Sequence, residues 1–244
     1  MRKQSDHHND APLRDAAGTR DAARPHRGVH AALWIAGAGG IGALAYAYLI
    51  RPWHLRWGAT REESVAALPG DDLIDHPRLQ STRAIIINAP ASEIWPWLAQ
   101  MGQGRGGLYS YDWLENLIGC DIHSLDHIDQ KLQFLRPGDM VRLGPKGYPF
   151  FTVVSVHPDD ALVLAAGFDP NDSSGAASHN RSTWAFVLRP IDKRTTRLIV
   201  RLRGAWEPAV AMDLFNRVFL EPVQFIMERK MIHGIRDRAE RSGE

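Results

Sequence analysis

The sequence predicts an α+β protein in which one membrane-spanning helix precedes a globular domain. Three features support this class. An uncharged run covers residues 31–50. Short segments rich in β-branched and aromatic residues, separated by turn signals, are spread over residues 82–203 and favour an antiparallel sheet. Apolar residues then recur at three- and four-residue steps from residue 209 almost to the C-terminus, which indicates a long amphipathic helix.

The N-terminal part is expected to be a tail followed by an anchor. Residues 1–30 lack apolar periodicity and are predicted to be disordered. As a helix, residues 31–50 would be roughly 30 Å long, which matches the hydrocarbon core of a bilayer. The flank Arg51-Pro-Trp-His-Leu-Arg-Trp57 suits the lipid headgroup layer. The main alternative is a signal peptide, cleaved after the small residues of Ala43-Leu-Ala45.

Two further expectations concern this anchor. Arginines flank it on both sides, and a small excess on the N-terminal side favours a cytoplasmic N-terminus and an extracytoplasmic domain. Ala32, Ala36 and Gly40 lie four residues apart, a spacing that lets two helices approach closely and form a homodimer. The alternative is an anchor that is simply rich in alanine and glycine.

The globular domain is expected over residues 80–241, after a juxtamembrane linker over 51–79. A first strand is predicted over 82–88. Two short helices should follow, over 93–101 and 108–118, with Ser92 and Gly119 as their start and stop signals. Further strands are predicted over residues 140–143, 150–156, 161–166, 183–188 and 198–203. The long C-terminal helix should be kinked at Pro222.

Composition excludes several classes of function. The chain has 244 residues, a net charge of +1 and one cysteine, Cys120. After residue 30 the charges nearly balance, whereas nucleic-acid binding requires a dense basic surface. A single cysteine allows neither an intrachain disulfide nor a zinc site with two or more cysteines. We therefore expect no nucleic-acid partner, no metal site and no cofactor.

Two segments resemble a known family. Ile85-Ile-Ile-Asn-Ala-Pro-Ala-Ser-Glu-Ile-Trp95 and Phe225-Ile-Met-Glu-Arg-Lys-Met231 are similar to the opening and closing elements of the START-like superfamily. This superfamily is also called polyketide cyclase/dehydrase-like, or SRPBCC, and has the helix-grip fold. The resemblance covers roughly residues 80–241, and the stretch 102–123 resembles a membrane-anchored bacterial subgroup.

The resemblance implies a curved antiparallel sheet of six to seven strands that grips the long helix. It also implies a cavity between them for a hydrophobic molecule, such as a lipid, an isoprenoid or a polyketide-like compound. Aromatic side chains with polar ends can line such a cavity, or they can simply cover the sheet. The candidate ligand-binding residues are Trp97, Met101, Arg105, Tyr109, Tyr111, Trp113, Trp184, Phe215 and Phe219.

Catalytic signals in the sequence are weak. The glycines of Gly102-Gln-Gly-Arg-Gly-Gly107 match a dinucleotide-binding pattern, but they follow a predicted helix where that motif requires a strand. A flexible loop is expected here, or a lid in which Arg105 meets an acidic group of the ligand. Cyclase or dehydratase chemistry would need a base in the cavity, and the candidates are Asp112 and His123. Whether the protein is an enzyme is left open.

Overall fold

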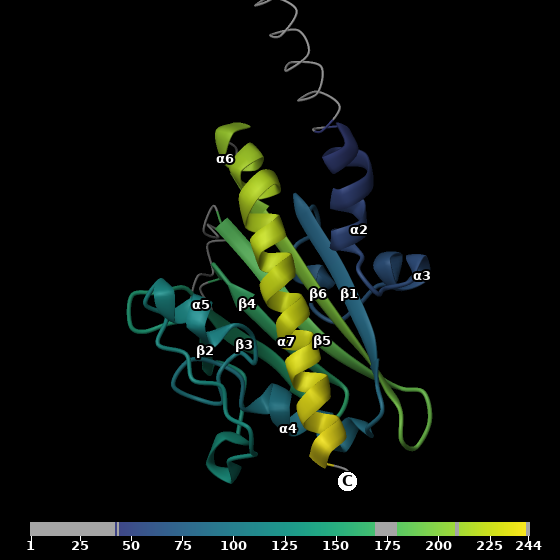
Figure 1. Cartoon of the computed structure of the whole chain (residues 1–244), viewed down its shortest axis with the longest axis vertical. Coiled ribbons are helices and arrows are strands. Elements are labelled where there is room, and N and C mark those ends of the chain that lie inside the picture. The colour runs from purple at the N-terminus through teal and green to yellow at the C-terminus, as the bar shows by residue number, and fades with distance from the viewer. Residues whose placement is uncertain (1–41, 43, 169–179, 208–209, 243–244) are drawn as a thin grey trace, which may run out of the picture. The chain divides into compact units, whose positions relative to one another are not determined.

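The computed structural model describes residue 42 and residues 44–168, 180–207 and 210–242, without the side chains of 210–212 and 242. The chain divides into two compact units, residues 1–45 and residues 46–244. Of the first unit, residues 42, 44 and 45 are described, and they are helical. The second unit contains the sheet and the helices labelled in Figure 1.

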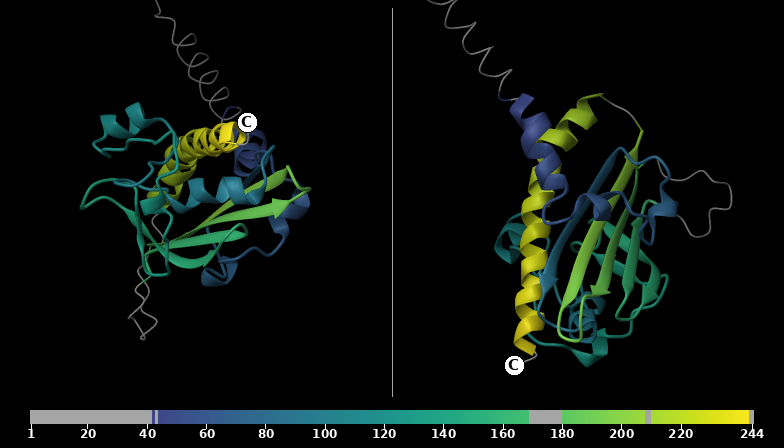
Figure 2. Two further views of the ribbon diagram at one scale, coloured as in Figure 1. Left: turned by 90° about the horizontal axis from the view of Figure 1, so that it is seen from below. Right: turned by 90° about the vertical axis from the view of Figure 1, so that its right-hand side faces the viewer.

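The centre of the second unit is a six-stranded sheet in which every neighbouring pair of strands is antiparallel. Its spatial order is β1-β6-β5-β4-β3-β2, so the first strand pairs with the last. The sheet is twisted and curved, as Figure 2 shows. The strands are β1 (Leu79–Ile87), β2 (Met140–Arg142), β3 (Phe150–His157), β4 (Ala161–Ala166), β5 (Asn180–Pro190) and β6 (Thr196–Trp206).

A long C-terminal helical segment covers one face of the sheet, here called the inner face (Figures 1 and 2). It consists of α6 (Val210–Phe215), the π-helix η4 (Asn216–Leu220) and α7 (Glu221–Ser242). Two short helices, α4 (Ala91–Ala99) and α5 (Asp112–Leu117), follow β1 along the chain. The predictions of an α+β class, an antiparallel sheet and a long C-terminal helix are therefore confirmed.

The irregularity expected at Pro222 takes the form of a π-helical turn. Proline has no N–H, and its ring collides with the carbonyl four residues earlier in a regular α-helix. The segment η4 lies directly before this proline, and the N–H of Glu221 donates to the carbonyl of Asn216, five residues back. The wider π-turn accommodates the proline within a continuous helical segment.

Strand β6 shows how the sequence separates the two faces of the sheet. Side chains alternate along a strand, so Leu198, Val200 and Leu202 share the inner face with the buried core. Arg201 points to the outer face, where its guanidinium donates to the carboxylate of Asp71 at 2.5 Å and to backbone carbonyls of residues 63 and 66. Arg197 and Arg203 of β6 also donate to residues of the segment 58–71, which precedes β1.

The region predicted as a linker, residues 51–79, packs on both sides of β1: its first residues contact α7, and the part from Gly58 to Asp71 contacts that outer face. It contains α2 (Arg51–Leu55), α3 (Arg61–Val65) and the 3-10 helix η2 (Asp71–Leu73). Thr60 and Glu63 form a capping box at the start of α3. Arg197 of β6 pairs with the carboxylate of Glu63 at 2.8 Å. The compact unit therefore begins well before residue 80.

The predicted membrane anchor, residues 31–50, lies outside the described residues except for residues 42 and 44–50. Among the helices that are described, none combines the length and the apolar character needed to cross a bilayer. The predicted tail over residues 1–30 also lies outside the described residues. Residues 46–50 form the π-helix η1 (Tyr46–Ile50), which leads directly into α2.

Candidate ligand-binding cavity

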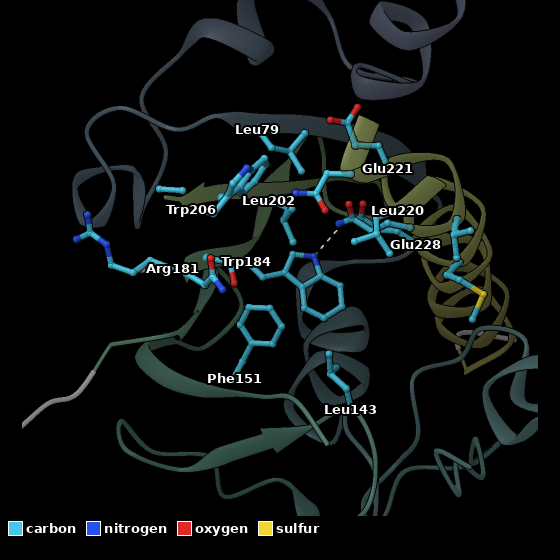
Figure 3. Close-up of a pocket in the computed structure, with 18 of the residues that line it drawn as sticks. Leu79, Leu143, Phe151, Arg181, Trp184, Leu202, Trp206, Leu220, Glu221 and Glu228 are labelled. Atoms are coloured by element: carbon cyan, nitrogen blue, oxygen red, sulfur yellow. Dashed lines mark hydrogen bonds between the residues drawn. The ribbon is translucent and has the colours of Figure 1, made fainter. Parts of the chain in front are cut away.

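A cavity of about 830 Å³ lies between the inner face of the sheet and the C-terminal helical segment (Figure 3). This volume lies in the range of small-molecule binding sites, roughly 300–1,000 Å³. Most of the lining is apolar, with a minority of polar groups. Its side chains come from β5, β6, α5, η4 and α7, among others, and include Leu79, Leu143, Phe151, Trp184, Leu202, Leu220, Val223, Met227 and Met231.

The periodicity of each element places these side chains. In the strands, alternate residues reach the cavity, as Ser182 and Trp184 do from β5. On the helix, lining residues recur at steps of three and four from Leu220 to Met231, because such residues share one helical face. Phe151 and Trp184 pack with ring centroids 5.5 Å apart and form an aromatic wall, visible in Figure 3.

One wall of the cavity carries a buried charged group. The carboxylate of Glu228 accepts a hydrogen bond from the indole N–H of Trp184 at 2.9 Å, and it forms an ion pair with Arg83 of β1. Both charged side chains are almost fully buried. Burial lowers the pKa of Arg83 to about 10, so its guanidinium stays charged at neutral pH. Removing either partner would leave an uncompensated charge in the core.

A second acidic residue of the lining is also neutralised. Glu221, at the start of α7, is buried and receives two hydrogen bonds from the guanidinium of Arg51, at 2.7 and 2.9 Å. A bidentate pair of this kind is among the stronger charge-assisted interactions. Glu221 and Glu228 of the cavity wall therefore have fixed cationic partners, Arg51 and Arg83 respectively.

Glu115 of α5 differs from these two residues. It lines the cavity, its residue is 7% exposed, and its Oε2 atom has no hydrogen-bond partner among the described residues. Burial, followed by the nearby charge of Asp112, raises the pKa of this carboxyl to about 7. Close to neutral pH, Glu115 can therefore present either a protonated carboxyl or a carboxylate to a molecule in the cavity.

Of the nine predicted ligand-binding residues, Trp184 is the one that lines this cavity. Trp97, Met101 and Tyr109 are buried in the core instead. The Tyr109 hydroxyl donates to the carbonyl of Trp97 at 3.0 Å, and the two rings meet edge to face. These side chains support the inner core between α4 and α7.

Arg105 and its glycine-rich loop form a closed turn. Gly102 and Gly107 exchange backbone hydrogen bonds of 2.9 and 3.0 Å. Both residues have positive φ angles, which glycine adopts without a steric penalty. The guanidinium of Arg105 donates to the carbonyls of Ala99 and Leu132 at 3.0 and 2.7 Å. These contacts direct the charge of Arg105 towards the protein backbone.

The two catalytic candidates lie apart from the cavity lining. The carboxylate of Asp112 accepts from the backbone N–H and the hydroxyl of Ser124, both at 2.7 Å. His123 is largely exposed and lies 3.2 Å from the carboxylate of Asp121. Asp112 is linked to the cavity indirectly, because its charge contributes to the raised pKa of Glu115.

The remaining aromatic candidates lie nearer the surface. Tyr111 is half-buried, with the ammonium of Lys230 5.9 Å from its ring centroid, while Trp113 is 69% exposed. Phe215 and Phe219 are about half exposed and stack on each other, with ring centroids 5.4 Å apart. Both are on the helical segment that borders the cavity.

No protein-family model matches the chain, and no curated protein matches it in sequence. Solved structures of similar fold include the Zhui aromatase/cyclase from Streptomyces sp. R1128, with 14% identity, a TM-score of 0.41 and coverage of 69% of this chain and 97% of that one. The self-sacrificing resistance protein CalC from Micromonospora echinospora has 13% identity and a TM-score of 0.36, with coverage of 67% and 95%. At these values the similarity identifies neither a ligand nor a reaction.

Proposed function

We propose that this protein is a membrane-tethered domain that holds a hydrophobic small molecule between its sheet and its C-terminal helix. The supporting observation is the cavity of about 830 Å³, with its mainly apolar lining and few polar groups. Enclosing an apolar ligand removes surface from water, at roughly 25 cal/mol per Å². Lipids, isoprenoids and polyketide-like molecules have suitable size and polarity.

The polar groups of the lining would orient such a ligand. The carboxylate of Glu228 is already bonded to Trp184 and Arg83, so it forms a fixed polar wall. The free Oε2 of Glu115 provides a donor or an acceptor, depending on its protonation. A mostly apolar molecule with one carbonyl or hydroxyl group would match this distribution.

The direct test is mass spectrometry of the full-length chain purified from membranes. We expect an apolar molecule of several hundred daltons at close to one per chain, on the scale of the cavity volume. Met227→Trp places a larger side chain in the lining, so this variant should lose the molecule. Met140→Trp is the matched control, because Met140 is about half exposed and outside the lining. Equal occupancy in both variants would contradict the proposal.

A second candidate function is an enzyme of the cyclase, dehydratase or hydrolase type that acts in the same cavity. The observation that favours it is Glu115, a buried carboxyl whose Oε2 atom has no hydrogen-bond partner among the described residues and whose pKa is raised to about 7. A general acid or base works best when its pKa lies near the working pH. The ligand recovered from Glu115→Gln should then differ in structure from that of the unmodified chain, because conversion would stop. Dehydration or hydrolysis also changes the mass, whereas a cyclisation without loss of water gives an isomer that chromatography separates. Identical molecules from both proteins would favour a carrier.

The tether itself remains part of the proposal. We propose that residues 31–50 span the membrane, that the domain lies on the extracytoplasmic side, and that the small residues of the anchor allow a homodimer. Lys193→Cys, on the exposed β5–β6 turn, tests the side of the membrane. A membrane-impermeant maleimide should label it in intact cells; labelling that requires lysis would place the domain in the cytoplasm.

A further inference from the structure

The molecule exposes a cluster of large apolar side chains on two neighbouring segments, η1–α2 and α6–η4, near the top of Figure 1. Most of these side chains are at least half exposed; Val218, for example, is 58% exposed. Contiguous apolar patches of this kind are uncommon on soluble surfaces and mark interaction sites. The cluster, called the apolar tip below, consists of Tyr48, Leu49, Ile50, Trp53, Leu214, Phe215, Val218, Phe219 and Leu220.

Specific contacts hold the two segments of the apolar tip together. The hydroxyl of Tyr46 donates to the backbone carbonyl of Arg217, and Arg51 forms its bidentate ion pair with Glu221. Trp53 packs edge to face on Phe225 of α7, with ring centroids 5.3 Å apart. These contacts hold together the two segments that carry the exposed apolar side chains, although the segments are about 170 residues apart in the sequence.

Charge and chain direction both indicate what covers the apolar tip. Neither 44–56 nor 214–220 contains an acidic residue, whereas Arg56 and Arg217 are exposed beside the apolar side chains. Aromatic and apolar residues bordered by arginine suit the headgroup region of an anionic bilayer. The uncharged run over residues 31–50 ends inside the tip, at Ile50. An anchor over residues 31–50 that is inserted in a membrane would therefore connect to the domain at this surface.

The cavity reaches the same surface. Leu220 of the apolar tip lines it, together with Asn216 of η4 and Val223 in the first turn of α7. We propose that the apolar tip docks into the lipid headgroup layer and that the cavity takes up its hydrophobic ligand directly from the bilayer. The docking surface stands on its own observations, whereas the uptake route rests on the proposed binding function.

Docking is tested in the full-length chain, reconstituted in phosphatidylcholine–phosphatidylglycerol vesicles that contain nitroxide-labelled lipid. In a Cys120→Ser background, an environment-sensitive fluorophore is attached at Val218→Cys or, as the matched control, at Lys193→Cys on the β5–β6 turn. That turn lies at the end of the sheet away from α6 (Figure 1). We expect a blue shift and several-fold stronger quenching by the labelled lipid at position 218 than at position 193.

Two results would overturn docking. Equal, weak quenching at both positions would show that the apolar tip stands away from the bilayer. A blue shift at position 218 without quenching by labelled lipid would show that protein, such as a second copy of this chain, covers the tip.

The uptake route has a separate readout. In the double variant Phe215→Glu, Phe219→Glu, two exposed apolar side chains of the tip become charged. The co-purified apolar molecule per chain should fall several-fold relative to the parent, with the unfolding temperature nearly unchanged because neither side chain is buried. Unchanged occupancy in a parent that carries the molecule would overturn direct uptake. A parent that carries none would overturn uptake and the proposed function together, while the quenching result would still decide docking.

Discussion

Arg51 and Glu221 form a two-point ion pair, with N–O distances of 2.7 and 2.9 Å, between segments 170 residues apart in the sequence. Each residue directly follows a π-helical segment and directly precedes a proline, Pro52 or Pro222. The pair therefore joins two similar helix irregularities, one at the C-terminal end of the predicted anchor and one beside the cavity. Since Glu221 is buried, the pair links the N-terminal segment to the cavity wall.

Removing the arginine should destabilise the domain. In Arg51→Ala the carboxylate of Glu221 loses its cation while it stays buried, which we expect to lower the free energy of unfolding by about 2 kcal/mol, less than a fully buried pair because Arg51 is partly exposed. Chemical denaturation measures this. Arg51→Met combined with Glu221→Gln should recover part of the loss, because no buried charge is left. A double variant that is less stable than Arg51→Ala would contradict this account.

Glu115→Gln should change the pH dependence of stability. The folded-state pKa of Glu115 is raised to about 7, above its usual value near 4.5. Below pH 4.5 both states hold the proton; as pH rises towards 7, the unfolded chain ionises more readily, and stability is lost. The glutamine variant should therefore gain up to about 2 kcal/mol relative to the parent by pH 8. Asp72→Asn, at an exposed site, should show no such trend in thermal unfolding from pH 4.5 to 8.

His54 should act in the opposite sense. It is buried, and this burial, followed by the charges of Arg83 and Arg51, lowers its pKa to about 4. Its neutral form is favoured in the folded state, so its contribution is complete above pH 6.5 and is lost as pH falls towards 4. His54→Phe should flatten the stability profile between pH 6.5 and 4. Replacing the exposed His76 by Gln should leave the slope unchanged; an equally steep profile in His54→Phe would contradict the prediction.

Gly234→Ala should disrupt the contact between α7 and the loop before α5. A Cβ atom at this position would lie 2.2 Å from the carbonyl oxygen of Tyr109, which is closer than any real contact. Because Tyr109 is buried, the helix and the loop must separate, at a cost of about 1–3 kcal/mol. Arg241→Ala, at an exposed site on the same helix, is the control. Equal unfolding midpoints for the two variants would show that the contact yields freely.

The fold was readable because its elements have regular patterns. The strand predicted over residues 198–203 lies within β6, and the helix predicted over 93–101 overlaps α4, since both patterns record which side chains turn inward. The candidate site was much less readable. Trp97 and Tyr109 are aromatic residues of the type that often line cavities, but they are part of the core. Glu115 lies in the lining, but nothing in the sequence distinguishes this glutamate of a short helix as a site residue.

By itself, the sequence determined the class of the fold, the order of its elements and the long C-terminal helix, because periodicities of two and 3.6 residues are local properties. Only the tertiary structure decided which charges are buried. Arg83 and Glu228 lie in segments that read as ordinary strand and helix, and they meet because β1 and α7 face each other across the inner core. Burial and pKa depend on contacts between distant residues, and no local pattern records them.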